Sequence, residues 1–380
     1  MRQSRVVAVV LGVTVAAGTA IMVLAGSSGT GAEPAAFTPR VPRTLPAPDA
    51  PVVDWSTPMR GEPMAVTAAG ADVVATALGE VRMLDGASGT TRWRTNVDGV
   101  RRSRPAVSAT KVAVATDTEL VVLERASGRV LATARIDGPS ALAITPVPSG
   151  AELVVVGSGT GAIAAVDATT GEGRWSAQYA GSIVVAPMVE RGVVVATWHS
   201  ATSTVLRAFD VGTGVERWHR DVGARSSAPL ATAGMVLVSA GSGVTDARAQ
   251  AYDVVTGAER WTTAVPGFSE RLVRPASDAT TAYLLDGVGT VTALDVRTGA
   301  MRWQQATGAS VIDSPLVLSG GSVLFPAFSD ALVVLDRVTG ALRSADVQPG
   351  VPIDVTATPA HLVLALRLAA PSRIEARPVP

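Results

Sequence analysis

The stretch "ALDVRTGAMRW", from Ala293 to Trp303, decides the fold because the chain repeats it. Close copies end at Trp175 ("AAVDATTGEGRW"), Trp218 ("RAFDVGTGVERW") and Trp261 ("QAYDVVTGAERW"). The acids of the seven copies are Asp85, Glu124, Asp167, Asp210, Asp253, Asp295 and Asp336. Their spacing of about 42 residues is typical of stacked supersecondary units.

Each period contains four strand signals. In the seventh copy these are "SPLVLSG", "SVLFPA", "ALVVLD" and "ALRSADV", between Ser314 and Val347. They are short, apolar and rich in β-branched residues, and turn residues separate them. Four strands per unit at this period predict the blades of a β-propeller, because a closed ring covers both faces of every blade.

Hairpin chemistry explains the motif. The acid ends the third strand and accepts hydrogen bonds from the turn, and a Thr or Ser three residues later adds another. The glycine adopts the left-handed conformation that closes the turn. The tryptophan lies on the outer strand and packs against the neighbouring blade. The structural set is Asp85, Gly89, Trp93, Asp167, Gly171, Trp175, Asp210, Gly214, Trp218, Asp253, Gly257, Trp261, Asp295, Gly299, Trp303, Asp336 and Gly340, with Trp55 as an isolated fourth-strand tryptophan.

The chain ends favour eight blades, with seven as the alternative. "HLVLAL" and "RIEARPV" (His361 to Val379) repeat the second and third strands, and the chain stops before a fourth. "VVDW" (Val52 to Trp55) matches a fourth strand without its first three. Together they make one blade, so we expect the N-terminal and C-terminal strands to pair and close the ring.

The pattern A-x-D-x-x-T-G-x-x-x-W resembles the tryptophan-docking motif of the pyrroloquinoline-quinone (PQQ)-type propeller repeat, over about residues 52–380. Two copies depart from it, with Ala132 and Ser344 in place of the tryptophan, and we expect looser blade contacts there. The resemblance implies either a quinoprotein-type enzyme or a non-enzymatic scaffold of the BamB type.

The sequence favours the scaffold. There is no cysteine, so the paired cysteines of many quinoproteins are missing, and Asn96 is the only asparagine. The three histidines, His199, His219 and His361, have no partner at metal-ligand spacing. "GSGTGAIAA" (Gly157 to Ala165) is predicted to be a hairpin loop without a following helix to bind phosphate. We therefore expect no PQQ, calcium or other cofactor, no metal and no catalytic residues.

The N-terminus predicts export. Arg2 and Arg5 precede an uncharged apolar run from Val6 to Ala25, long enough to span a bilayer as a helix. Cleavage as a signal peptide is the alternative. The divisions are a signal or anchor helix (1–25), a Pro/Gly/Ala-rich linker (26–50) and the propeller (51–380). The net charge is zero, so general binding to nucleic acid is not expected.

One rim of the ring is the candidate binding surface. It carries the loops between blades and the loops between second and third strands. Arginines in these loops predict a positively biased sector for an acidic partner, with ordinary solvated arginines as the alternative. Six of the seven tryptophans lie in the repeat register, and Trp198 does not. Trp198 is followed by His199 and is either an exposed interface anchor or a buried residue. The candidate rim residues are Arg101, Arg102, Arg104, Trp198, His199, Arg225, Arg271 and Arg274.

We therefore expect an extracytoplasmic scaffold, held at the cell membrane by its N-terminal helix or secreted if that helix is cleaved. Its partner would be an envelope protein that the sequence does not identify. A PQQ-dependent dehydrogenase and an extracytoplasmic ligand sensor are the alternatives, because one propeller fold serves many functions.

Overall fold

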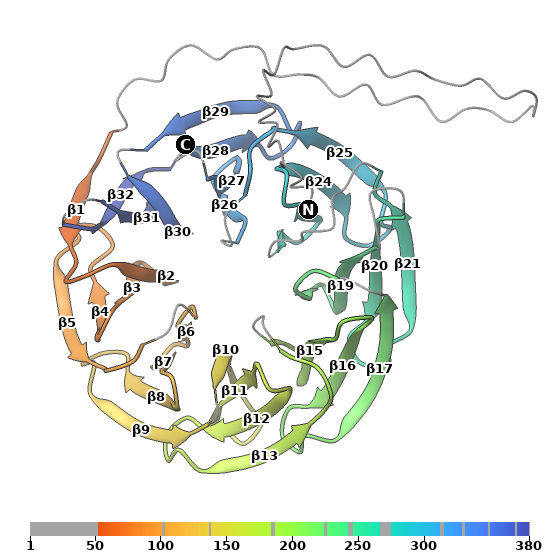
Figure 1. The fold of residues 1–380 in the computed structure, drawn as a ribbon, viewed down its shortest axis with the longest axis horizontal. Coiled ribbons are helices and arrows are strands. Elements are labelled where there is room, and N and C mark those ends of the chain that lie inside the picture. Colours follow the sequence, from red (N-terminus) through yellow and green to blue (C-terminus); the bar gives the residue numbers. More distant parts are fainter. Residues whose placement is uncertain are drawn as a thin grey trace, which may run out of the picture. The chain divides into compact units, whose positions relative to one another are not determined.

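In the computed structural model, residues 52–379 form a ring of eight four-stranded blades (Figure 1). The structure describes residues 52–100, 103–136, 138–183, 187–223, 226–241, 246–266, 275–311, 315–328, 331–348, 350–368 and 371–379. The expected helix over residues 1–25 and the linker over 26–50 lie outside these residues. Within the described part, no helix is long and apolar enough to cross a membrane.

The strands follow the chain in blade order, with blades numbered from the first complete repeat. Blade 1 has β2 (Pro63–Ala69), β3 (Asp72–Ala77), β4 (Glu80–Leu84) and β5 (Thr91–Asn96). Blade 2 has β6 (Ala106–Val107), β7 (Lys111–Ala115), β8 (Glu119–Glu124) and β9 (Val130–Arg135). Blade 3 has β10 (Pro139–Pro146), β11 (Glu152–Ser158), β12 (Ala162–Asp167) and β13 (Gly173–Gln178). Blade 4 has β14 (Met188–Glu190), β15 (Val193–His199), β16 (Thr204–Asp210) and β17 (Glu216–Gly223).

Blade 5 has β18 (Leu230–Thr232), β19 (Met235–Ala240), β20 (Arg248–Asp253) and β21 (Glu259–Ala264). Blade 6 has β22 (Ala276–Ser277), β23 (Thr281–Leu285), β24 (Thr290–Asp295) and β25 (Met301–Ala306). Blade 7 has β26 (Val317–Ser319), β27 (Ser322–Pro326), β28 (Ala331–Asp336) and β29 (Leu342–Val347). Blade 8 has β30 (Val351–Ala357), β31 (His361–Arg367), β32 (Arg373–Pro378) and, from the other end of the chain, β1 (Trp55–Pro58).

The ring closes as the sequence predicts, by pairing the two ends of the folded chain. β1 runs antiparallel to β32, with Trp55 opposite Ala376 and Pro58 opposite Arg373. The predicted strand "VVDW" is placed three residues too early, because β1 begins at Trp55. In this register Val53 falls opposite Pro378, the last residue of β32, and a proline has no N–H to donate to a neighbouring strand. Eight blades are therefore confirmed, and the seven-bladed alternative is wrong.

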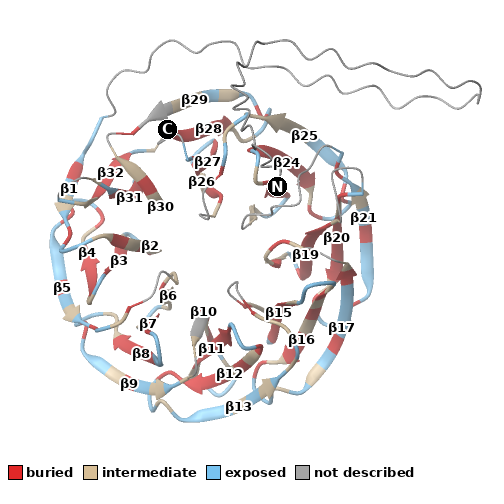
Figure 2. Ribbon diagram, viewed as in Figure 1, coloured by how far each residue is buried: buried red, intermediate tan, exposed pale blue. Residues whose placement is uncertain are grey.

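Burial follows the position of a strand within its blade. The second and third strands, such as β4 and β27, are buried on both faces because a neighbouring blade covers each face. The fourth strand alternates between buried and exposed residues, as in β5 and β21. Figure 2 shows this as a buried interior and an exposed outer wall. This arrangement explains why the sequence reads as short continuous apolar runs followed by an alternating one.

The core is divided among the blade interfaces. Each of the eight clusters of buried apolar side chains combines residues from two neighbouring blades, for example Leu237 of blade 5 with Leu284 of blade 6. Stability therefore depends on the contact between neighbours, as expected for a repeat protein.

Candidate functional site: the docking motif and the loop rim

The repeated turn has the predicted hydrogen bonds. In blade 5, Asp253 Oδ1 accepts from the backbone N of Val255 (3.0 Å) and Thr256 (2.9 Å) and from Thr256 Oγ1 (3.0 Å). The Gly257 N–H donates to the Asp253 carbonyl at 2.8 Å, and Gly257 has a φ of 67°. Aspartate, threonine and glycine are thus required by the turn itself.

An arginine that the sequence analysis did not single out completes this turn. Arg260 donates to Asp253 Oδ2 at 2.6 Å, and this hydrogen bond is the main cause that lowers the pKa of Asp253 to about 2. Arg302 does the same for Asp295, whose pKa is also about 2. The same pair recurs as Arg92–Asp85, Arg174–Asp167, Arg217–Asp210 and Arg343–Asp336. Its signal was visible in the sequence, because arginine directly precedes the tryptophan in every copy quoted above.

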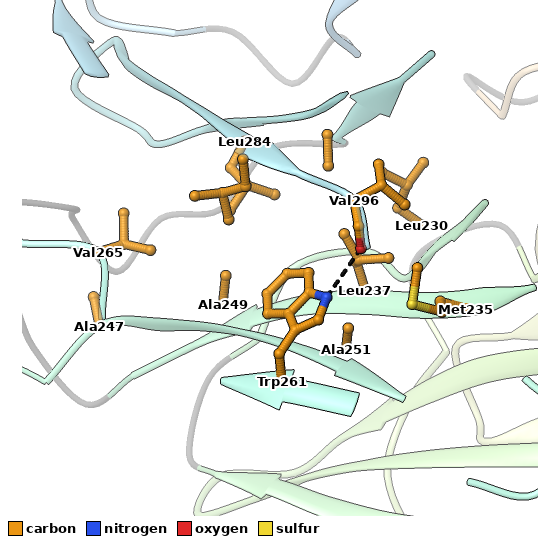
Figure 3. Packing of buried hydrophobic residues seen from close by; sticks show 12 residues of the cluster. Leu230, Met235, Leu237, Ala247, Ala249, Ala251, Trp261, Val265, Leu284 and Val296 are labelled. Carbon is orange, nitrogen blue, oxygen red and sulfur yellow. Dashed lines mark hydrogen bonds between the residues drawn. The ribbon is translucent and has the colours of Figure 1, made fainter. Parts of the chain in front are cut away.

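The tryptophans dock onto the next blade, as predicted. Trp261 Nε1 donates to the Val296 carbonyl of blade 6 at 2.9 Å (Figure 3). A Cβ at Gly299 would lie 2.5 Å from the indole Cε3, so only glycine fits beneath the ring. The equivalent hydrogen bonds run from Trp55 to Gly86, Trp93 to Arg125, Trp175 to Val211, Trp218 to Val254 and Trp303 to Arg337, at 2.8 to 3.2 Å.

The two blades without a docking tryptophan differ from each other. At the interface between blades 7 and 8, the fourth strand of blade 8 comes from the other chain end. Blade 8 therefore has no turn between its third and fourth strands, which is the turn that a tryptophan in place of Ser344 would contact. Instead, the fully buried Glu375 on β32 pairs with Arg373 (2.8 Å) and Arg377 (2.9 Å). Ile374 and Ala376 alternate with these residues and pack with blade 1, so the ionic triad faces blade 7. Between blades 2 and 3, Ala132 leaves an open groove, which is discussed below.

The loops between blades and the loops between second and third strands lie on the same rim, as expected. The backbone N of Val97, after β5, donates to the carbonyl of Gly79 in the loop between β3 and β4, at 3.0 Å. Thr307 and Gly289 of blade 6 make the same bond at 3.1 Å. The start of each inter-blade loop is therefore held against the second-to-third-strand loop of its own blade.

Arg104 does not form part of a free positive sector. Its guanidinium makes a bidentate pair with Asp354 of blade 8, from Nε and Nη2 at 2.9 Å each. Asp354 Oδ2 also accepts from the backbone N of Val66 in blade 1, at 3.0 Å. Arg104 is in blade 2, so this contact links three successive blades across the closure of the ring. The prediction of a partner-facing role for Arg104 is wrong, because its charge is neutralised by Asp354.

Trp198 lies at the rim end of β15 but is not an exposed anchor. It is 2% exposed, and its Nε1 donates to the Gly161 carbonyl of blade 3 at 2.9 Å. Tyr179 packs edge-on against it, with ring centroids 5.3 Å apart. Of the two alternatives in the sequence analysis, burial is correct. Trp198 therefore joins neighbouring blades, and the glycine-rich stretch beneath it is a hairpin loop as predicted.

His199 is partly buried beside Trp198. Its Nδ1 lies 3.2 Å from Thr204 Oγ1, and burial lowers the pKa of the imidazole. The backbone of His199 pairs with Ser182, which ties this loop to the preceding inter-blade loop. The remaining candidates, Arg101, Arg102, Arg225, Arg271 and Arg274, lie outside the described residues.

The rim has an apolar sector that the sequence analysis missed. The loops between second and third strands expose Val288 of blade 6, Phe328 of blade 7 and Leu78 of blade 1, at 54, 57 and 67%. Only blade 8 separates blades 7 and 1 in the ring. The corresponding loops of blades 2, 3 and 4 present Asp117 and Thr118, Gly159 to Gly161, and Ser200 to Ser203. The sequence signal that was missed is the difference in composition between these short loops. Those of blades 1, 6 and 7 contain a large apolar residue, whereas those of blades 2, 3 and 4 are polar or rich in glycine.

Among the residues that the structure describes, no group of three or more His, Asp or Glu side chains could hold a metal ion. The ion pairs and the ionic triad described above all lie within blade turns or at blade interfaces. The rim sector of Leu78, Val288 and Phe328 is named here the apolar rim, and no hydrogen bond or ion pair of these three side chains joins it to a neighbouring blade.

Comparisons with known proteins agree with the architecture. A sequence model of the family described as outer membrane protein assembly factor BamB matches residues 77–156, 118–245 and 181–351. No curated protein matches the chain. The crystal structure of BamB from Moraxella catarrhalis is similar over 86% of this chain and 100% of its own, with 15% identity and a TM-score of 0.66.

Two further solved structures share the fold. The computationally designed Ika8 protein covers 86% of this chain and 99% of its own, with 16% identity and a TM-score of 0.71. The quinohemoprotein alcohol dehydrogenase ADHIIG from Pseudomonas putida HK5 covers 87% of this chain and 78% of its own, with 11% identity and a TM-score of 0.62. At these identities the likeness establishes the fold alone, since a designed protein and an enzyme share it.

Proposed function

Since the chain belongs to the BamB family of PQQ-type repeat propellers, we propose that it is a non-enzymatic scaffold that binds another protein of the cell envelope. The predicted N-terminal helix would export the propeller and hold it at the membrane. The proposal takes its binding role from the family and its binding surface from the geometry of this chain.

The observation that carries the proposal is the apolar rim. Leu78, Val288 and Phe328 stand at the tips of short loops on three of four successive blades. Apolar side chains that a folded domain leaves exposed on one rim are candidates for contact with another protein. Aromatic residues such as Phe328 are also enriched at the centres of interfaces.

The ring supplies the rigidity that such a surface needs. Phe328 is held by a hydrogen bond from its own backbone N to the Ser310 carbonyl, at 2.8 Å. The Gly79 carbonyl beside Leu78 accepts the bond from Val97 described above. Because these tips are fixed to paired strands, binding costs little loop ordering. The arginines outside the described residues, Arg101, Arg102, Arg225, Arg271 and Arg274, would add attraction for an acidic partner.

Recovery of a partner from the native membrane tests the proposal. The tagged full-length chain is crosslinked and purified beside a Leu78→Asp/Phe328→Asp variant. We expect a stoichiometric protein with the native chain and at least about tenfold less with the variant, because two interface anchors are lost.

Val338→Asp is the matched control. Val338 is 81% exposed, but it lies in the turn between β28 and β29, on the opposite rim. The control should recover the partner at the native level. Equal recovery by the native chain and the rim variant would contradict the apolar rim as the binding surface.

A further inference from the structure

The contact between blades 2 and 3 lacks two hydrogen bonds with which other fourth strands dock. Ala132 on β9 has no indole to donate to the next blade. Two residues later, Ala134 stands where other copies have a threonine whose hydroxyl donates to the glycine carbonyl of the next turn. This second bond joins Thr57 to Gly89 (2.6 Å), Thr95 to Gly128 (2.6 Å) and Thr263 to Gly299 (2.8 Å).

At this interface β9 lies directly against the turn of blade 3. A Cβ at Gly171 would lie 2.7 Å from the Thr133 carbonyl oxygen, whereas at Gly128 it would lie 2.5 Å from the ring of Trp93. An open groove of about 510 Å³ lies beside the contact, lined by apolar side chains of both blades that include Ala134, Ile136 and Val166. Solvent therefore reaches the outer part of an interface that a buried indole closes elsewhere.

Two other interfaces depart from the common pattern, but other contacts fasten them. At the interface between blades 7 and 8, the buried triad around Glu375 occupies the face toward blade 7. At the closure between blades 8 and 1, Trp55 and Thr57 make both docking bonds, and Asp354 accepts from the backbone of Val66. The ring is therefore least firmly docked between blades 2 and 3, and not where the two chain ends meet.

One ion pair joins blades 2 and 3 nearer the centre of the ring. Lys111, at the start of β7, lies 2.7 Å from Glu152, at the start of β11, and both side chains are only 13% exposed. Thr110 Oγ1 donates to the same carboxylate oxygen at 2.6 Å. Because second strands lie inside fourth strands (Figure 1), this pair holds the inner side of an interface whose outer side is open.

We propose that the interface between blades 2 and 3, named here the blade 2–3 joint, is where the closed ring opens locally, and that the Lys111–Glu152 pair limits the opening. The outer side separates first, as β9 leaves the turn at Gly171, and water reaches buried residues such as Ala168. Local opening of this kind occurs where few contacts oppose it. The proposal does not depend on the apolar rim, which belongs to blades 6, 7 and 1.

Cysteine labelling of the full-length chain measures this opening, because the chain has no cysteine of its own. Ala168→Cys places a thiol at a fully buried position that packs against blade 2. Val254→Cys is the matched control. Val254 is equally buried and also follows the acid of its turn, but its carbonyl accepts the hydrogen bond of the docking Trp218.

Ala168→Cys should react with a thiol reagent at least about a hundredfold faster than Val254→Cys, because no docking indole opposes the opening. The labelling rate follows the population of the open state when closing is faster than the reaction. Lys111→Met should raise the rate of Ala168→Cys about tenfold further, since it removes a charged hydrogen bond across the joint, and should leave Val254→Cys unchanged. Arg343→Met, which breaks an ion pair in blade 7, should change neither rate.

Hydrogen exchange makes the same comparison on the unsubstituted chain. The amide of Ala168 donates to the Glu152 carbonyl at 2.9 Å, and the amide of Val254 donates to the Gly234 carbonyl at 3.0 Å. Both hydrogen bonds lie within one blade, so the difference between them is the neighbouring blade that covers them. Exchange should be faster at Ala168.

Faster labelling and faster exchange at Ala168, with a further increase in Lys111→Met, support the proposal. Equal labelling of the two cysteines, or equal exchange of the two amides, would overturn the joint. A labelling rate of Ala168→Cys that Lys111→Met leaves unchanged would overturn the role of the ion pair. Circular dichroism melting establishes that each variant is folded, and hydrogen exchange decides where one is not.

Discussion

Replacing Trp261 by alanine should destabilise the propeller by about 3–5 kcal/mol. The indole is buried between blades 5 and 6 (Figure 3) and donates its N–H to the Val296 carbonyl at 2.9 Å. Burial of about 150–250 Å² at roughly 25 cal/mol per Å² corresponds to about 4–6 kcal/mol. Partial closure of the cavity between the blades reduces this to the range above.

Trp261→Phe separates packing from hydrogen bonding. Phenylalanine keeps most of the ring but leaves the Val296 carbonyl without its donor, so we expect a loss of about 1–3 kcal/mol. Equilibrium unfolding of the full-length chain in guanidinium chloride measures both variants through the shift of the midpoint.

The order of stability should be native, then Trp261→Phe, then Trp261→Ala. A loss below about 1 kcal/mol for Trp261→Ala would refute the reasoning, because the docking tryptophans would then not hold the blades together. A loss for Trp261→Phe equal to that of Trp261→Ala would show that the hydrogen bond, and not the buried ring, dominates.

Three further predictions concern the ionic contacts. Glu375→Ala should lower the free energy of unfolding by about 3–5 kcal/mol in a denaturant titration, because it leaves buried arginine charge without its carboxylate partner. Glu375→Gln should lower it by less. An unchanged free energy of unfolding in both variants would contradict the triad. Asp354→Asn should lower the thermal midpoint by weakening the link from Arg104 across the ring closure, and a double-mutant cycle with Arg104→Ala should show coupling between the two residues, whereas strict additivity would contradict the link. The pKa values of Asp253 and Asp295 are lowered from 3.8 to about 2. The stabilisation of the folded state by these two carboxylates is therefore present above about pH 4 and is lost as the pH falls to about 2. A Tm that stays constant over this pH interval would contradict these ion pairs.

The sequence was sufficient for the fold because each local feature of the repeat has one physical use. The acid, the glycine and the tryptophan each satisfy a need of the turn or of the next blade, and "RIEARPV" requires a fourth strand that only the other chain end supplies. The start of β1 was placed wrongly because the register between β1 and β32, which joins the two chain ends, is not visible in the local sequence.

The candidate site was harder to predict because exposure and pairing depend on contacts between blades. Trp198 is buried by Tyr179, and Arg104 is paired with Asp354, 250 residues away. Neither partner can be read from local spacing. The apolar rim depends on which loop tips face solvent, which the sequence of Leu78 or Phe328 alone does not specify.

Photocrosslinking from the rim tests the proposed function most directly. A photoreactive amino acid replaces Phe328 in the full-length chain, expressed in its own cells, and the matched chain carries it at Val338 on the opposite rim. The scaffold account predicts one discrete protein adduct from position 328 and none from position 338. The absence of an adduct at 328, or the same adduct from both positions, would contradict it.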